Sequence, residues 1–136
     1  MTIVHVSGKR KEAIARATIG PGNGTIRINS LHFEHHMPRM ARERIRQALL
    51  IADGPVDLSK INIDVVTTGG GVMGQAEAIA SAMARGLVEY SKSDSLHDAY
   101  VKYERTFIAG DHRQTEVHKP SQSSKGPRHK RQKSYR

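Results

Sequence analysis

The sequence predicts a two-layer α/β (α+β) domain followed by an extended basic tail at the C-terminus. Three observations support this prediction. Short runs of β-branched residues alternate with polar residues in the first 30 positions and again from residue 61. Three later segments repeat apolar residues every three or four positions, as amphipathic helices do. The last 18 residues lack both patterns and carry lysine and arginine without any acid.

Four segments are predicted to be strands. Residues 3–6 and 13–19 are rich in β-formers and flank a polar stretch at residues 7–12, so they should form a hairpin. Residues 25–28 follow the turn signal Pro21-Gly22-Asn23-Gly24 and alternate as a third strand would. We expect these three strands to be antiparallel. Residues 61–66 alternate in the same way and lead into a run of glycines.

Three further segments are predicted to be helices. The first covers residues 38–52, with Pro38 suited to the first turn and Asp53-Gly54-Pro55 ending it. The second covers residues 75–90, where many alanines permit close approach to a sheet. The third covers residues 94–103. Because the apolar pattern disappears after about Gly110, we expect one domain at residues 1–110 and a tail at residues 111–136.

Composition restricts the class of protein. There is no cysteine, which excludes disulfides, cysteine-ligated zinc and cysteine nucleophiles. There is also no secretory signal pattern and no run of 18 apolar residues, so we expect a cytoplasmic protein.

Charge indicates the kind of partner. The chain has 22 Lys and Arg against 13 Asp and Glu, a net charge of +9, and seven of these cations lie within residues 119–136. Membrane binding would require bulky apolar residues among the cations, and the tail offers only Tyr135. Nucleic acid is therefore the favoured partner. Because ordering a backbone costs about 1 kcal/mol or more per residue, we expect the tail to become ordered only on RNA.

Two further groups of cations are candidate RNA contacts. Lys9, Arg10 and Lys11 lie at the bend of the first hairpin, where they could bind neighbouring phosphates of an RNA backbone. Arg39, Arg42 and Arg46 recur at helical spacing on the side of their helix opposite the apolar residues. A solvent-exposed helix face would explain this second group equally well.

The segment Gly69-Gly70-Gly71-Val72-Met73-Gly74 satisfies the G-x-G-x-x-G pattern of dinucleotide-binding loops, between a predicted strand and a predicted helix. Asp94 follows at about the required distance, but in that fold the acid should end a second parallel strand, whereas residues 91–103 have a helical pattern. The alternative is that Gly69, Gly70 and Gly71 let the backbone and a helix N-terminus approach an RNA phosphate.

Other chemistry has little support in the sequence. His32, His35 and His36 form the densest histidine cluster, but only Glu34 lies near them in the sequence as a further ligand, and we assign them no metal. There is no G-x-S-x-G and no H-E-x-x-H motif. We therefore predict no catalytic activity and no cofactor.

Three separated motifs resemble one family. They are residues 7–17, with the sequence SGKRKEAIARA, residues 69–76, with the sequence GGGVMGQA, and the ending Gln132-Lys133-Ser134-Tyr135-Arg136. In this order they resemble the universal S-nine family of small-subunit ribosomal proteins, and the ending resembles its archaeal and eukaryotic branch. One departure is Pro127 before Arg128, where many relatives have alanine, and its fixed φ could change the local path of the tail.

The resemblance implies a fold of the type seen in the second domain of ribosomal protein S-five. That fold has a four-stranded sheet with helices on one face and a left-handed βαβ crossover. It also implies a place in the head of the small subunit, with ribosomal RNA and neighbouring head proteins as partners and no small-molecule substrate. The tail would reach the anticodon stem-loop of P-site tRNA through Lys133, Ser134, Tyr135 and Arg136. The expected contacts with ribosomal RNA are Lys9, Arg10, Lys11, Arg39, Arg42, Arg46, Gly69, Gly70, Gly71, Lys125, Arg128, Lys130 and Arg131.

Two other functions remain open from the sequence. One is a nucleic-acid-binding protein that acts away from the ribosome, such as an RNA chaperone or a regulator. The other is a small nucleotide-dependent enzyme built on the glycine loop.

Overall fold

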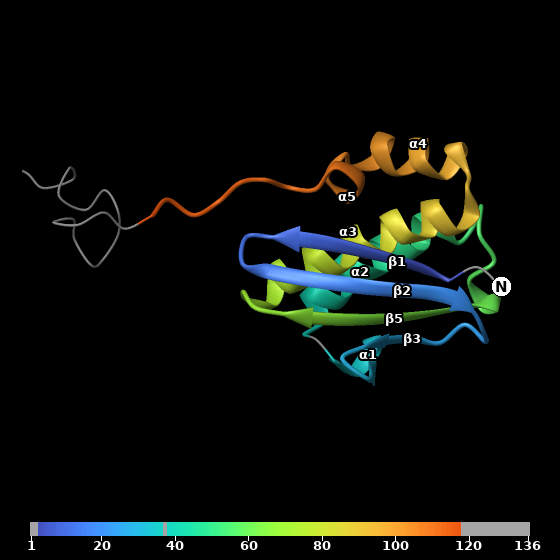
Figure 1. Ribbon diagram of the computed structural model, residues 1–136, viewed down its shortest axis with the longest axis horizontal. Helices are drawn as coiled ribbons and strands as arrows, with labels where there is room; N and C mark the ends of the chain where they lie inside the picture. The colour runs from blue at the N-terminus through green and yellow to red at the C-terminus, as the bar shows by residue number, and fades with distance from the viewer. Residues whose placement is uncertain (1–2, 37, 118–136) are drawn as a thin grey trace, which may run out of the picture.

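The structure is a computed structural model that describes residues 3–36 and 38–117. It is a five-stranded sheet in the order β1-β2-β5-β3-β4 with helices packed on one face (Figure 1). The strands are β1 (Val4–Arg10), β2 (Ala13–Pro21), β3 (Ile26–Ile28), β4 (Leu31–His32) and β5 (Ile61–Thr68). The helices are α1 (Phe33–His36), α2 (Arg39–Ala52), the 3-10 helix η1 (Leu58–Lys60), α3 (Val72–Ser91), α4 (Asp94–Tyr103) and α5 (Thr106–Ala109).

The predicted hairpin is confirmed, but its strands are longer than the sequence suggested. β1 and β2 pair in antiparallel fashion from Val4 opposite Ile19 to Arg10 opposite Ala13. The turn contains only Lys11 and Glu12, and Lys11 has a φ of 52°, the left-handed conformation that a tight two-residue turn requires. Residues 7–10, expected in a loop, are therefore strand residues because backbone pairing with β2 continues to the turn.

One expectation about the sheet was wrong, and a second holds only for the direction of the strands. It has five strands rather than four, because residues 29 and 30 form a second tight turn with positive φ that folds β4 back on β3. β3 does run antiparallel to β2, as expected, but it does not pair with it, because β5 lies between them, antiparallel to β2 and parallel to β3. The connection from β3 to β5 contains helix α2, so these elements form the βαβ crossover that two neighbouring parallel strands need.

The core lies between the sheet and two helices. Alternate residues of β2 and β5 are buried, among them Ala15, Ile19, Ile63 and Val65. α3 packs directly on β1 and β2, and its small residues allow a close approach. A Cβ added to Gly8 of β1 would lie 2.2 Å from the carbonyl oxygen of Ala78 in α3. The opposite face of the sheet carries no helix in the described part of the chain.

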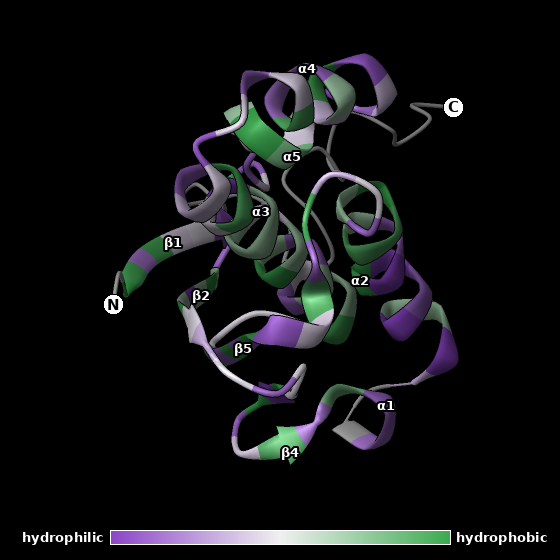
Figure 2. Ribbon diagram, turned by 90° about the vertical axis from the view of Figure 1, so that its right-hand side faces the viewer, coloured by the Kyte–Doolittle hydropathy of each residue, from purple (hydrophilic) through white to green (hydrophobic). Residues whose placement is uncertain are grey.

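The predicted helices are confirmed, with two shifted starts. α4 has the predicted bounds, α2 begins one residue after Pro38, and α3 begins at Val72 rather than at residue 75. α4 and α5 pack on α2 and α3, and the buried Tyr100 hydroxyl donates a 2.6 Å hydrogen bond to the carbonyl of Ala48. Figure 2 shows the apolar parts of α2 and α3 gathered at the centre of the fold. Within residues 3–36 and 38–117, no helix is long and apolar enough to cross a membrane.

Candidate nucleic-acid interface

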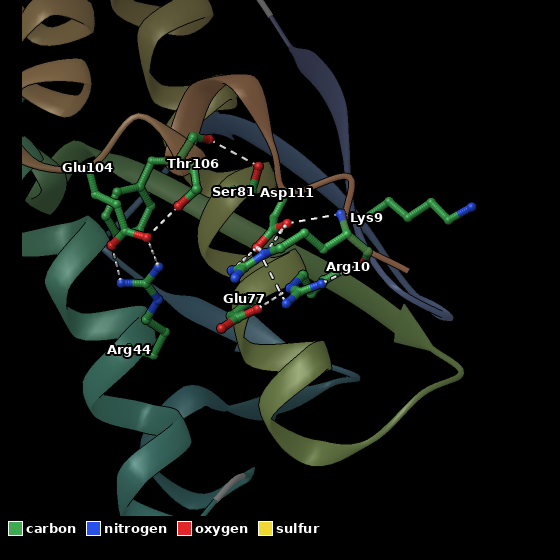
Figure 3. Close-up of a pocket in the computed structure, with 10 residues that line it drawn as sticks. Lys9, Arg10, Arg44, Glu77, Ser81, Glu104, Thr106 and Asp111 are labelled. Carbon is green, nitrogen blue, oxygen red and sulfur yellow. Dashed lines mark hydrogen bonds and ion pairs between the residues drawn. The ribbon is translucent and has the colours of Figure 1, made fainter. Parts of the chain in front are cut away.

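The hairpin cations do not form one cluster, because the strand and turn direct them differently. Lys9 lies on the open face of the sheet, Lys11 lies in the exposed turn, and Arg10 lies on the side covered by α3. Figure 3 shows the Lys9 side chain pointing away from the acids that surround Arg10. Neither Lys9 nor Lys11 makes an ion pair with any residue that the structure describes. Both are therefore available to an external anion.

Arg10 is held inside the protein. Its Nε donates to Glu77 Oε2 of α3 at 2.6 Å, and its Nη2 lies 3.3 Å from Asp111 Oδ2. Its Nη1 donates to the carbonyl oxygen of Arg113 at 3.0 Å. Arg113 in turn pairs with Asp111, and its hydrogen bonds hold the pKa of the Asp111 carboxyl well below its usual range. Arg10 therefore joins the hairpin to α3 and to the start of the tail (Figure 3).

The glycine loop packs against this same hairpin. Gly69 and Gly70 have φ values of 75° and 66°, which favour glycine. A Cβ at Gly69 would lie 2.6 Å from the carbonyl oxygen of Glu12, and one at Gly70 would lie 2.9 Å from Ala13. Both glycines thus have an intramolecular reason for their identity. Gly71 differs, because it precedes the first turn of α3 with open space around it.

The hairpin turn, the glycine loop and the start of the tail together line a hollow of about 400 Å³. Lys11, Gln114 and Thr115 are among the residues that line it. Gly71 and Met73, at the N-terminus of α3, also line it. Two of the segments that the sequence marked as RNA contacts, the hairpin turn and the glycine loop, therefore meet here with the first residues of the predicted tail.

The three predicted arginines of α2 are not equivalent. Arg46 pairs with Glu43 at 3.0 Å and with Glu34 of α1 at 3.6 Å, and Arg42 donates to the backbone carbonyl of Glu34. Arg39, at the start of the helix, is exposed and makes no ion pair in the described part of the chain. Of the three, Arg39 is the one whose charge faces solvent without a partner among the residues that the structure describes.

Two cations on the open sheet face were missed at the sequence level. Arg16 of β2 and Arg27 of β3 are exposed and make no ion pair with the described residues. Arg16 lies opposite Ser7 and Val66, beside a shallow hollow of about 520 Å³. The alternation of Ala15, Arg16 and Ala17 was the available signal, because alternate residues of a strand point to opposite faces.

Comparisons with known proteins cover the whole chain. A family model described as Ribosomal protein S9/S16 matches residues 8–136. The chain belongs to this ribosomal protein family. It is 43% identical to the small ribosomal subunit protein uS9 of Methanococcus maripaludis, and the similarity covers all 136 residues of this chain and all of the relative. Identity to the protein of the same name from Methanococcus vannielii is 42%, again over both full lengths.

Membership of the S9/S16 family confirms the resemblance inferred from the three motifs, and the family is one of structural ribosomal proteins rather than of enzymes. The geometry also argues against the dinucleotide-binding alternative. Asp94 begins helix α4, and β5 has one parallel neighbour, β3, with its antiparallel neighbour β2 on the other side. In a dinucleotide fold the acid would end a parallel strand beside the glycine loop.

Several predicted residues of this S9/S16 protein lie outside the described part of the chain: Lys125, Arg128, Lys130, Arg131, Lys133, Ser134, Tyr135 and Arg136. Of the histidine cluster, His32 and His35 are exposed, and their rings lie 6.1 Å apart. Within the described residues, no group of three His, Asp or Glu side chains is placed to hold a metal ion.

Proposed function

We propose that this protein is a structural constituent of the small ribosomal subunit and binds ribosomal RNA in the cytoplasm. The observation that carries the proposal is the similarity over both full lengths to proteins named small ribosomal subunit protein uS9. The distribution of charge supports it independently, because a polycation releases condensed counterions when it pairs with phosphates. Neighbouring proteins of the subunit would be its other partners.

The RNA surface of the folded domain comprises the hairpin turn, the glycine loop and α2. Of these residues, Lys9, Lys11 and Arg39 contribute most to the RNA affinity of the folded domain, because no ion pair with the described residues has to be broken before they bind phosphate. Arg42 and Arg46 must exchange contacts with Glu34 for contacts with phosphate, which lowers their net contribution. Gly69, Gly70 and Gly71 bring backbone, rather than charge, close to the RNA. Arg16 and Arg27 extend this surface across the open face of the sheet.

The tail provides the second part of the RNA surface. Lys125, Arg128, Lys130 and Arg131 pair with phosphates of ribosomal RNA, and Lys133 to Arg136 reach the anticodon stem-loop of P-site tRNA. The support for this assignment is the resemblance of the terminal motif to its family, together with the acid-free charge of residues 119–136. The planar fork of a terminal arginine suits a bidentate contact with phosphate.

The same resemblance assigns the fold to the second-domain type of ribosomal protein S-five, with its left-handed crossover. The connection β3-α2-β5 is the parallel unit to which that handedness would apply. The division into a domain at residues 1–110 and a tail at residues 111–136 also remains part of the proposal. The contacts of Asp111 and Arg113 with Arg10 show that the first tail residues lie against the domain.

Sedimentation tests the proposed function directly. Lysate from cells expressing the tagged full-length chain is fractionated on a sucrose gradient at high salt. We expect the protein to travel with small subunits, because a subunit constituent is held by many cooperative contacts. Release from the subunits by high salt would instead favour an RNA chaperone or regulator that acts away from the ribosome. Saturable binding of ATP, GTP or NAD would favour the nucleotide-dependent enzyme.

A further inference from the structure

We propose that Arg10 is a positioning residue: with Glu77 and Asp111 it fastens the root of the tail to the edge of the sheet and so sets the direction in which the basic tail leaves the domain. The tail root is defined here as residues 110–113. This inference rests on the proposed RNA-binding role of the tail, and it gives Arg10 a role different from direct contact with phosphate.

The first support is the number of contacts that converge on one guanidinium. All three of its nitrogens are used, by Glu77 at 2.6 Å, by Asp111 at 3.3 Å and by the carbonyl oxygen of Arg113 at 3.0 Å. The Arg10 side chain is only 12% exposed and that of Asp111 only 13%. Water therefore screens these charges less than it screens an ordinary surface ion pair, and loss of one partner leaves a charge poorly solvated.

The second support is the backbone. β1 is an edge strand of the sheet, and Asp111 forms an isolated parallel bridge with Arg10 along its free edge. Immediately upstream, α3 holds α5 in place: the Arg85 Nε donates to the carbonyl of Ile108 at 2.6 Å, and the Ser81 hydroxyl donates to that of Phe107 at 3.0 Å. The root is thus fixed from α5 as far as Arg113, and Gly110, with a φ of 77°, makes the bend between them.

The third support is the direction of exit. From α5 the chain runs beside the end of β1, where Asp111 forms its bridge with Arg10, and then continues beyond the hairpin-turn end of the sheet (Figure 1). Gln114 and Thr115 therefore line the same hollow as Lys11 and the glycine loop. A fixed root makes the turn and the tail parts of one continuous RNA surface. It also lowers the conformational entropy lost on binding, because the root is ordered before RNA arrives.

A spin-label experiment on the full-length protein tests the geometry. The chain has no cysteine, so Val66→Cys on the open sheet face and Thr115→Cys after the root give one defined pair of labels. We expect a narrow distance distribution in this background and a clearly broader one when Arg10→Lys or Asp111→Asn is added. Lysine keeps the charge of Arg10 but cannot serve three partners in a planar fork. Unchanged distributions in both variants would overturn the proposal.

An RNA-binding experiment tests the consequence for RNA affinity. For one substitution, the change of charge and the loss of positioning predict opposite changes in affinity. Asp111→Asn removes one negative charge, so electrostatics alone predicts tighter binding to a transcript of small-subunit ribosomal RNA. Asp53→Asn, in the exposed turn after α2, makes the same charge change at a residue that does not contact the root and is the matched control. We expect Asp111→Asn to bind about tenfold more weakly than this control, equivalent to about 1.4 kcal/mol. Equal affinities would contradict the proposal.

Two further measurements separate the possible failures. Thermal unfolding of every variant identifies a loss of folding, and Arg10→Lys supplies a test at constant net charge if Asp111→Asn does not fold. If the wild-type protein itself fails to bind the transcript, the proposed function fails. The spin-label distances still decide whether Arg10 positions the root, because they are measured without RNA.

Discussion

Arg44 of α2 and Glu104, at the end of α4, form a bidentate ion pair with hydrogen bonds of 2.6 and 2.7 Å. The guanidinium carbon of Arg44 also lies 4.7 Å from the centre of the Phe107 ring, and the Thr106 hydroxyl donates to Glu104. One arginine therefore joins α2 to α4 and α5, the two helices that lead into the tail (Figure 3).

The first prediction is that Arg44→Lys lowers the free energy of unfolding by about 1 kcal/mol, because lysine loses one hydrogen bond and the contact with the ring. The Arg44 side chain is 20% exposed and that of Glu104 is 35% exposed, so screening by water keeps the loss modest. Urea unfolding measures it. The matched control is Arg46→Lys in the more exposed pair with Glu43, which should change stability by no more than about 0.5 kcal/mol. Equal losses of unfolding free energy in Arg44→Lys and Arg46→Lys would contradict the stabilising role given to the pair of Arg44 and Glu104.

The second prediction concerns acid. The hydrogen bond from Arg44 lowers the pKa of Glu104 below its ordinary value of 4.5. A lowered folded-state pKa contributes stability above pH 4.5, and this contribution is lost as the pH falls through the folded-state pKa. Glu104→Gln should therefore lower the free energy of unfolding at pH 7. The difference in this free energy between the variant and the wild type should shrink below about pH 4.5. Urea unfolding at a series of pH values checks this, and a difference independent of pH would contradict it.

The third prediction concerns the contact between α3 and the sheet. Gly8→Ala should destabilise the protein by about 3 kcal/mol or prevent folding, because the added methyl would meet backbone atoms of Ala78 and Ala82 at 2.2 and 2.8 Å. Gly54→Ala is the control, since a Cβ there meets nothing within 4 Å. Thermal unfolding compares the two. A stable Gly8→Ala variant would show that α3 can move away from β1.

Local pattern was enough to predict most elements. Residues 94–103 were predicted to be a helix and form α4, because Leu96 and Tyr100 give a clear apolar spacing and Ser93 caps the first turn. The start of α3 was placed three residues late. Val72 and Met73 are exposed, so nothing in the apolar pattern marks them as the first turn.

The rest depends on contacts that no local pattern contains. β4 has only two residues, too few to show alternation, and the parallel position of β3 depends on the crossover through α2. The placement of Arg10 likewise required the register of the hairpin and a partner 103 residues away in the sequence, Arg113. Sequence alone therefore grouped Arg10 with Lys9 and Lys11, although the strand sends neighbouring side chains to opposite faces.

The fourth prediction is that binding to ribosomal RNA weakens steeply with salt, and that the tail causes most of this dependence. The logarithm of the binding constant should fall by roughly 0.7 to 0.9 per phosphate neutralised for each decade of salt. Deleting residues 119–136 removes seven cations and should make the slope shallower by several units. Filter binding at four salt concentrations measures it. An unchanged slope would assign the electrostatic contacts to the hairpin, the open sheet face and α2.

The last prediction separates assembly from tRNA binding within one chain. Removing Lys133 to Arg136 should leave incorporation into small subunits nearly intact, because the folded domain and Arg128 to Arg131 retain most of the proposed RNA contacts. Affinity for P-site tRNA should fall. Arg136→Ala alone should weaken it about fivefold, since one charged hydrogen bond to phosphate contributes about 1 kcal/mol when water competes. Arg136→Lys should recover part of the loss, because it restores the charge without the planar fork.

The measurement is tRNA affinity on purified subunits, with the occupancy of the variant protein determined in the same preparation. Lys125→Ala is the matched control, because it removes an equal charge earlier in the tail, outside the tip, and should leave tRNA affinity unchanged. Normal tRNA affinity at full occupancy of the truncated protein would remove the proposed role of the tip. Failure of the truncated protein to enter subunits would instead make the tip an assembly element, since the contacts that remain would then be too few to hold the protein on the RNA.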